Sequence, residues 1–204
     1  MRESIVLNKL RAGERVFSVK SNFSCSRPVE MAGIAGFDCF WACREHVPND
    51  WQVLERQILA AKAYGMDTMV RVARGSYSEL IKPLELDASG ILIPHVMSAD
   101  EARDLVRQVR FHPIGRRPVD GGNADGQFGM TPFAEYAEFV NRNRFVFVQI
   151  EDPEAVPYIG EIAAVPGIDG LFFGPGDYSH AIGKPGRLDH PEVDRVRRMV
   201  VAEA

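Results

Sequence analysis

Short apolar runs that alternate with longer amphipathic segments constrain the fold of this chain more than any other feature. The six clear runs are RVFSV (15–19), DCFWAC (38–43), DTMVRV (67–72), GILIPHV (90–96), FVFVQI (145–150) and GLFFG (170–174). Most are apolar at nearly every position instead of at every second one, so both faces of each strand are expected to be buried. The pattern predicts a parallel sheet covered by helices.

The segments between these runs have helical spacing and helix-boundary signals. They are expected to form helices at VEMAGIAG (29–36), DWQVLERQILAAKAYG (50–65), SYSELIKPLEL (76–86), SADEARDLVRQVR (98–110), TPFAEYAEFVNRN (131–143) and HPEVDRVRRMVVAEA (190–204). Asp50 is an N-cap candidate, Ser98 precedes Glu101 by three residues as in a capping box, and Gly65 closes its helix.

Repeated strand–helix units of roughly 25 residues favour a (β/α)8 TIM barrel, with an open doubly wound sheet as the alternative. No G-x-G-x-x-G turn follows an early strand, which disfavours a dinucleotide-binding sheet. A seventh strand is expected near residues 116–119, and the sequence ends in a helix with no eighth strand. We therefore predict one domain, residues 1–204, built as a TIM barrel that lacks its last βα unit.

Composition excludes several classes of protein. The 204 residues carry a formal net charge of −4, which disfavours a dedicated nucleic-acid binder. No apolar stretch approaches the roughly 20 residues of a membrane helix, and the N-terminus lacks the apolar region of a signal peptide. A cytoplasmic location is the default expectation. The three cysteines, Cys25, Cys39 and Cys43, form no disulfide framework and are expected to be free thiols.

Two carboxylates follow the last two apolar runs. Glu151 comes directly after FVFVQI, and Asp177 comes shortly after GLFF. On neighbouring parallel strands both would lie at the carboxyl-terminal rim, where a pair of carboxylates suits a divalent cation with oxygen ligands. The alternative is that both are solvated loop residues or helix caps.

Further polar residues are predicted at the same rim. Arg71 lies inside the apolar VRV, His95 ends the fourth run, and Gln149 precedes Glu151 by two residues. His95 is interpreted as a structural hydrogen-bonding residue, and Arg71 alternatively as a buried ion-pair partner of Glu45 or Glu151. Taken together, these residues are the types that an active site needs: ligands for a metal ion, a cation for developing negative charge and a titratable base.

The Gly-rich stretch GGNADGQFGM (121–130) lies between two helical segments. Such stretches are usually mobile loops, and an active-site lid is the alternative.

The residues at this rim carry a family resemblance that covers almost the whole chain. The segments involved are NKLRAGERVFS, VEMAGIAGFD, EHVPND, VRV, GILIPHV, VQIED, AAVPGIDGLFFGPGDYS and HPEV. In these the chain resembles the metal-dependent 2-oxo acid aldolases of the 4-hydroxy-2-oxoheptanedioate and 2-dehydro-3-deoxyglucarate aldolase type. That family belongs to the phosphoenolpyruvate/pyruvate barrel superfamily.

The resemblance implies a metal and substrate role for each matching residue. Glu151 and Asp177 would bind Mg²⁺, Mn²⁺ or Co²⁺, and Gln149 would orient the 2-oxo acid or a metal-bound water. The backbone N–H groups of Gly176 and Asp177 would hold the substrate carboxylate. Arg71 would contact the keto oxygen.

The residues that the resemblance implies for proton transfer match the family pattern less fully than the metal ligands do. His46 would be the acid/base residue, paired with Glu85 as the aligned acid. Cys43 stands where the family usually has Asp, Arg44 replaces a small residue, and Glu85 and Asp87 change the usual L-D-x-G-A pattern. These departures affect the proton path and leave the metal half of the site intact.

The implied reaction is the reversible cleavage of a 4-hydroxy-2-oxo acid to pyruvate and an aldehyde, through a metal-stabilised enolate. No lysine ends any of the six runs, so a Schiff-base route has no candidate there. The alternatives are a citrate-lyase-like or malyl-coenzyme-A-lyase-like enzyme, or a catalytically weak oxo-acid-binding protein. The resemblance also implies a homo-oligomer, a trimer or a hexamer.

Overall fold

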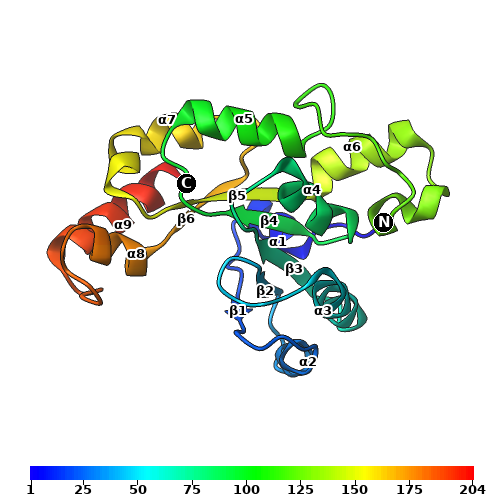
Figure 1. Cartoon of the computed structure of the whole chain (residues 1–204), viewed down its shortest axis with the longest axis horizontal. Coiled ribbons are helices and arrows are strands. Elements are labelled where there is room, and N and C mark those ends of the chain that lie inside the picture. Colours follow the sequence, from blue (N-terminus) through cyan, green and yellow to red (C-terminus); the bar gives the residue numbers. More distant parts are fainter.

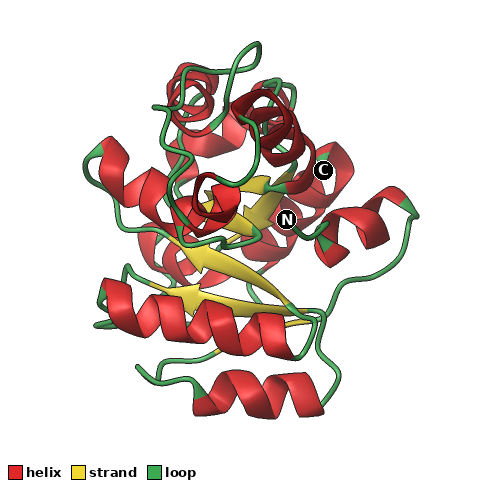
Figure 2. Ribbon diagram, turned by 90° about the vertical axis from the view of Figure 1, so that its right-hand side faces the viewer, coloured by secondary structure: helices red, strands yellow, loops and turns green.

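A computed structural model describes residues 1–204 and has a curled parallel sheet at its centre (Figures 1 and 2). Its six strands are paired in chain order, each parallel to the next. They are β1 (Ser18–Lys20), β2 (Cys39–Cys43), β3 (Asp67–Arg71), β4 (Gly90–Ile93), β5 (Phe145–Ile150) and β6 (Gly170–Phe173). The sheet is a half-barrel, which confirms the predicted barrel-type α/β architecture.

Nine helices surround the sheet, and most of them cover its outer face, as expected for strands that are apolar on both faces. They are α1 (Ile5–Arg11), α2 (Arg27–Ile34), α3 (Trp51–Ala63), α4 (Tyr77–Glu85), α5 (Ala99–Val109), α6 (Phe133–Asn143), α7 (Ile159–Ala163), α8 (Pro175–Ala181) and α9 (Pro191–Glu203), with 3₁₀ segments η1 (Ala124–Gly129) and η2 (Pro153–Tyr158). Figure 1 shows α2 and α3 beside β1 to β3, and α5, α7 and α9 beside β4 to β6. None of these helices is long and apolar enough to cross a membrane.

The predicted helix caps are present. Asp50 accepts a hydrogen bond from the Val53 N–H at 2.7 Å, and Ser98 accepts one from the Glu101 N–H at 3.2 Å. The Glu101 carboxylate reaches back to the N–H of Met97 at 2.9 Å, one residue before the N-cap position. Each cap satisfies an N–H group that the helix itself leaves without a partner.

The inner face of the sheet holds a separate apolar cluster. Met69, Leu92 and Phe145 pack there with Val6 and Leu7 of α1. The short helix α1, which the sequence pattern did not predict, therefore closes the end of the half-barrel where the strands begin. Gly90 of β4 is required in this layer, because a Cβ atom at that position would lie 2.1 Å from the Phe145 ring.

Ion pairs collect at this amino-terminal end of the strands. Asp67 begins β3 and is fully buried, and it accepts hydrogen bonds from the Ser4 hydroxyl at 2.6 Å and the Val6 N–H at 2.9 Å. Asp87, just before β4, pairs with Arg144 at 2.6 Å, just before β5. Each buried carboxylate here has a cationic or N–H partner, which satisfies its charge within the fold.

The seventh strand predicted at residues 116–119 is wrong. The N–H groups of Arg116 and Arg117 donate to the carbonyls of Arg107 and Arg110 at the end of α5, at 2.7 and 2.8 Å. Pro118 has no N–H to offer a neighbouring strand. The segment is therefore tied to the helix, and β4 pairs directly with β5.

The Gly-rich stretch 121–130 contains η1 and is anchored by one buried carboxylate. Asp125 is 1% exposed and accepts hydrogen bonds from Arg117 at 2.8 Å and the Tyr136 hydroxyl at 2.6 Å. This anchor lies near Glu85, at the end of α4 that leads into the start of β4. The stretch therefore lies at the opposite end of the strands from Glu151 and does not cover that rim in the same chain.

We predict that Asp67→Ala lowers the free energy of unfolding by about 3 kcal/mol, because it strips a buried carboxylate from Arg2, Ser4 and the start of α1. Urea denaturation followed by circular dichroism measures the change. Asp189→Ala, which breaks an exposed ion pair with Arg187, is the control and should leave the midpoint unchanged. An unshifted midpoint in Asp67→Ala would contradict the proposed anchoring of α1.

Candidate active site

The parallel register brings the predicted residues to the carboxyl-terminal rim of the half-barrel. Cys43, the last residue of β2, lies beside Arg71, the last residue of β3. In β5 the side chains alternate between the two faces, so Gln149 and Glu151 point to the same side as Phe147 of the inner cluster. Strand register alone therefore collects an arginine, an amide and a carboxylate above the apolar interior.

Glu151 is buried and tightly held. It is 1% exposed, and its Oε1 accepts a hydrogen bond from the His95 backbone N–H at 3.1 Å. Its Oε2 accepts a hydrogen bond from the Gln149 amide. Gly174 lies directly against it, because a Cβ atom there would lie 2.4 Å from Oε2. The first glycine of GPGD is thus required by the close approach of β6 to the Glu151 carboxylate.

Asp177 faces Glu151 and changes its protonation. Burial raises the pKa of Glu151 to about 7, the Asp177 carboxylate adds to the rise by like charge and a hydrogen bond, and His95 opposes it. The two acids predicted from sequence are therefore brought together. Because neighbouring carboxylates resist simultaneous ionisation, the pair calls for a proton or a cation between them.

The donor set fits a hard divalent cation. Glu151 and Asp177 supply carboxylate oxygens, and the buried Gln149 Oε1 atom has no hydrogen-bond partner. Oxygen ligands of this kind, completed by water or substrate, suit Mg²⁺ or Mn²⁺. No group of three or more His, Cys, Asp and Glu side chains converges on one point, so the protein contribution to such a site is a carboxylate pair.

Arg71 is 5% exposed and lies among three groups from β2 and the residues directly after it. Its Nε is 2.9 Å from Glu45 Oε2, and its Nη2 is 3.3 Å from the Cys43 sulfur. Its guanidinium also lies 5.2 Å from the centre of the Trp41 ring. Of the two ion-pair partners considered from sequence, Glu45 is the one that the structure supports.

His95 occupies the middle of the rim. Its Nδ1 lies 3.0 Å from Asp152 Oδ2 and 3.7 Å from Glu151 Oε1, and its Nε2 lies 3.7 Å from Glu45 Oε1. Burial lowers the pKa of His95, but the hydrogen bond to Asp152 and the surrounding carboxylates outweigh it and raise that pKa overall. The residue is more than the lone structural histidine expected from the sequence, because three carboxylates face its ring.

His46 lies at the outer edge of this group. Its side chain is 58% exposed, and its Nε2 is 3.5 Å from Glu45 Oε2. Its backbone N–H donates to the Cys43 sulfur at 3.4 Å. The carboxylate beside His46 in this chain is thus Glu45.

Glu85 is not brought to His46. It ends α4 near Arg117 and Asp125, at the opposite end of the strands, where burial raises its pKa. Within one chain the predicted His46–Glu85 pair does not form.

Sequence reasoning considered Glu45 only as a partner of Arg71, and it missed both the approach of Glu45 to His95 and the part played by Asp152. Both directly neighbour residues that were selected, since Glu45 precedes His46 and Asp152 follows Glu151. Their adjacency was a usable signal, but only the tertiary structure shows that both face His95.

The start of α8 supplies unpaired backbone donors. The N–H groups of Gly176 and Asp177 have no backbone acceptor, as is usual in the first turn of a helix. A Cβ atom at Gly176 would meet no atom within 4 Å, so the space in front of it is open. The position is compatible with a carboxylate ligand.

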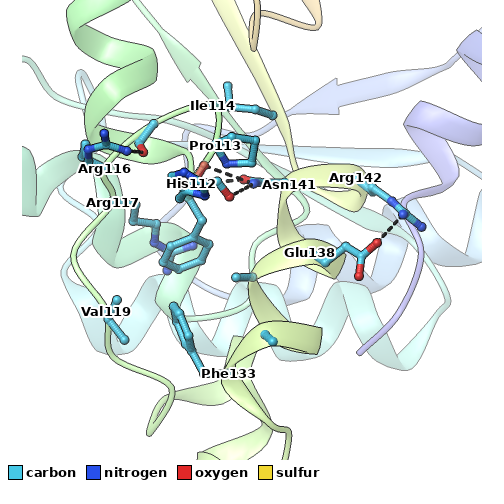
Figure 3. Close-up of a pocket in the computed structure, with 14 residues that line it drawn as sticks. His112, Pro113, Ile114, Arg116, Arg117, Val119, Phe133, Glu138, Asn141 and Arg142 are labelled. Carbon is cyan, nitrogen blue, oxygen red and sulfur yellow. Dashed lines mark hydrogen bonds and ion pairs between the residues drawn. The ribbon is translucent and has the colours of Figure 1, made fainter.

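A large cavity lies elsewhere. It measures about 770 Å³ and is formed by the connection between α5 and α6 together with α6 itself (Figure 3). Figure 3 shows His112, Pro113, Asn141 and Phe133 around it. It contains none of the predicted site residues and follows the end of α5, near the amino-terminal ends of β5 and β6. This cavity lies at the opposite end of the sheet from the candidate site.

Known proteins resemble this chain along most of its length. Residues 24–204 match the family described as HpcH/HpaI aldolase/citrate lyase. The chain is 35% identical over 188 residues to the 2-keto-3-deoxy-L-rhamnonate aldolase of Escherichia coli O17:K52:H18, covering 92% of this chain and 70% of that protein. It is 33% identical over 208 residues to the 5-keto-4-deoxy-D-glucarate aldolase of Klebsiella pneumoniae, covering 100% and 80%.

A solved structure has the same arrangement of elements. The HpcH/HpaI aldolase from Desulfitobacterium hafniense superposes with a TM-score of 0.92 at 30% identity, covering 100% of this chain and 78% of that one. The agreement confirms the family resemblance seen in the sequence and the carbon–carbon lyase class that it implied. With the family match covering most of its residues, this chain belongs to the HpcH/HpaI aldolase/citrate lyase family.

Proposed function

We propose that this protein cleaves a 4-hydroxy-2-oxo acid reversibly to pyruvate and an aldehyde, using Mg²⁺ or Mn²⁺ held by Glu151 and Asp177. The observation that carries the proposal is the pair formed by the buried Glu151 and the exposed Asp177, at the same rim as Arg71, Gln149 and His46. The relatives named above are aldolases of deoxy-keto sugar acids, which supports a substrate of that chemical class.

In the proposed reaction, the bond between carbons 3 and 4 breaks and its electron pair passes into the keto group of the pyruvate half. A bound divalent cation supplies a Lewis acid that stabilises negative charge on oxygen. Arg71 adds a positive charge whose side chain is buried, and a charge that is shielded from water stabilises a developing negative charge more strongly. Its ion pair with Glu45 keeps the guanidinium in place.

The proton leaves from the hydroxyl group on carbon 4. We assign its removal to His46, which is exposed at the mouth of the site and has Glu45 beside it. A proton returned to carbon 3 completes pyruvate. The N–H groups of Gly176 and Asp177 are assigned to the substrate carboxylate, and the Gln149 amide to orienting the keto acid.

The homo-oligomer and the cytoplasmic location expected from the sequence stay predictions. Two competing functions also stay testable: a lyase that uses a coenzyme A thioester, and an oxo-acid-binding protein without turnover. Neither is favoured by a particular contact in the structure.

The first test is pyruvate release from a series of 4-hydroxy-2-oxo acids. We expect EDTA to abolish it, Mn²⁺ to restore it, and Glu151→Ala to remove it, because the carboxylate pair would be lost. Asp189→Ala, which changes only an exposed ion pair, should retain full activity. Metal-independent turnover would refute the proposed metal role, and pyruvate binding without turnover would favour the binding protein.

The second test concerns proton transfer. His46→Ala should lower turnover by about 10²-fold or more while leaving Mn²⁺ affinity unchanged, because His46 acts on the substrate and does not contact the carboxylate pair. Steady-state kinetics and calorimetry measure the two quantities. Wild-type turnover in this variant would eliminate His46 as the base.

The third test uses the raised pKa of Glu151. In the metal-free protein this carboxyl carries a proton below a pH of about 7, so a cation must displace that proton in order to bind. Mn²⁺ affinity should therefore fall by roughly tenfold for each pH unit below 7 and level off above it. Calorimetry at pH 6 should show proton release on binding. A dissociation constant that is equal at pH 6 and pH 8 would contradict the assignment.

A further inference from the structure

His95 has no part in the reaction as proposed, yet it adopts an unusual backbone conformation beside Glu151. Its φ angle is +55°, in the left-handed region that non-glycine residues rarely occupy. Residues held in this region persist only where surrounding contacts determine them, and they cluster at functional sites. The contacts of His95 therefore indicate which neighbouring groups depend on this backbone conformation.

The backbone of His95 connects β4 to the end of β5. Its N–H donates to Glu151 Oε1 at 3.1 Å, and the next residue, Val96, donates its N–H to the Gln149 carbonyl at 3.3 Å. The His95 carbonyl accepts a hydrogen bond from Arg74 at 2.8 Å. The backbone N–H and the backbone carbonyl of His95 thus both have partners, and the N–H is the group that holds the buried Glu151 carboxylate.

The ring of His95 is anchored separately. Its Nδ1 lies 3.0 Å from Asp152 Oδ2, and since a carboxylate only accepts, Nδ1 carries the hydrogen. The same atom is 3.7 Å from Glu151 Oε1. Asp152 therefore holds the His95 ring beside Glu151 Oε1, the same oxygen that the His95 backbone N–H contacts.

Together with Gln149, these contacts determine the orientation of the Glu151 carboxylate. His95 holds Oε1 and Gln149 holds Oε2, so the carboxylate is gripped at both oxygens. Each oxygen still has a lone pair for another partner. We propose that His95, anchored by Asp152, is a positioning residue that holds Glu151 in the orientation in which it binds a divalent cation. This inference rests on the proposed function.

The test measures Mn²⁺ binding to the metal-free protein by calorimetry in wild type, His95→Gly, Asp152→Ala and the double variant. Glycine retains the backbone N–H and favours the left-handed conformation, so His95→Gly removes the ring alone. His95→Asn is a second choice should the glycine variant not fold, since Asn also tolerates positive φ. His112→Asn, an exposed histidine at the other end of the strands, is the matched control.

We expect the dissociation constant for Mn²⁺ to rise about tenfold or more in His95→Gly and in Asp152→Ala, as for other groups that orient a metal ligand. The double variant should show no further rise, because both changes release the same ring. The Mn²⁺ concentration for half-maximal pyruvate release should rise by the same factor, and saturating Mn²⁺ should restore kcat to within about threefold. A purely structural histidine would change thermal unfolding without changing Mn²⁺ affinity.

Wild-type Mn²⁺ affinity in both single variants would overturn the positioning role. So would a kcat loss that saturating Mn²⁺ does not restore, since that places His95 in the chemistry instead. If wild-type protein bound no Mn²⁺, the proposed function would fail and this inference with it. The calorimetry of the wild-type protein alone shows that result, so a failure of the proposed function is told apart from a failure of the positioning role.

Discussion

The parallel register of the curled sheet is the constraint on which the rest of the structure depends. Because neighbouring strands are aligned and side chains alternate, inward-facing residues form layers across the half-barrel. The lower layers are apolar and are closed by α1. The carboxyl-terminal ends of β2, β3 and β5 carry Cys43, Arg71 and Gln149, with Glu151 just beyond. One geometric rule therefore produces both the core and the site.

The two ends of the strands manage charge differently. At the amino-terminal end, Asp67 and Asp87 are matched by cations and N–H donors, and the network contributes to stability. At the carboxyl-terminal end, Glu151 and Asp177 face each other, and the pKa of Glu151 is raised, mainly by burial and further by Asp177. Buried charges are paired at one end of the strands, and a carboxylate pair is left at the other end. The residues that stabilise the fold are therefore separate from those of the candidate active site.

Departures from the family pattern fall in the part of the rim to which we assign proton transfer. The sulfur of Cys43 accepts hydrogen bonds from Arg71 and from the backbone of His46, so a sulfur acceptor stands where a carboxylate is usual. Glu45 alone then neutralises Arg71. The contacts of Glu151 described above do not involve Cys43, Arg44 or Glu85.

The sequence by itself determined the α/β class, the six strands, the capped helices and the pair Glu151 and Asp177, because periodicity, caps and strand ends are local properties. It could not place residues 116–119, whose N–H groups are taken by α5, nor Glu85, which an aligned motif put beside His46. Only the tertiary structure decided these positions and the role of His95. Its conformation depends on carboxylates that follow other strands, and no local pattern records such contacts.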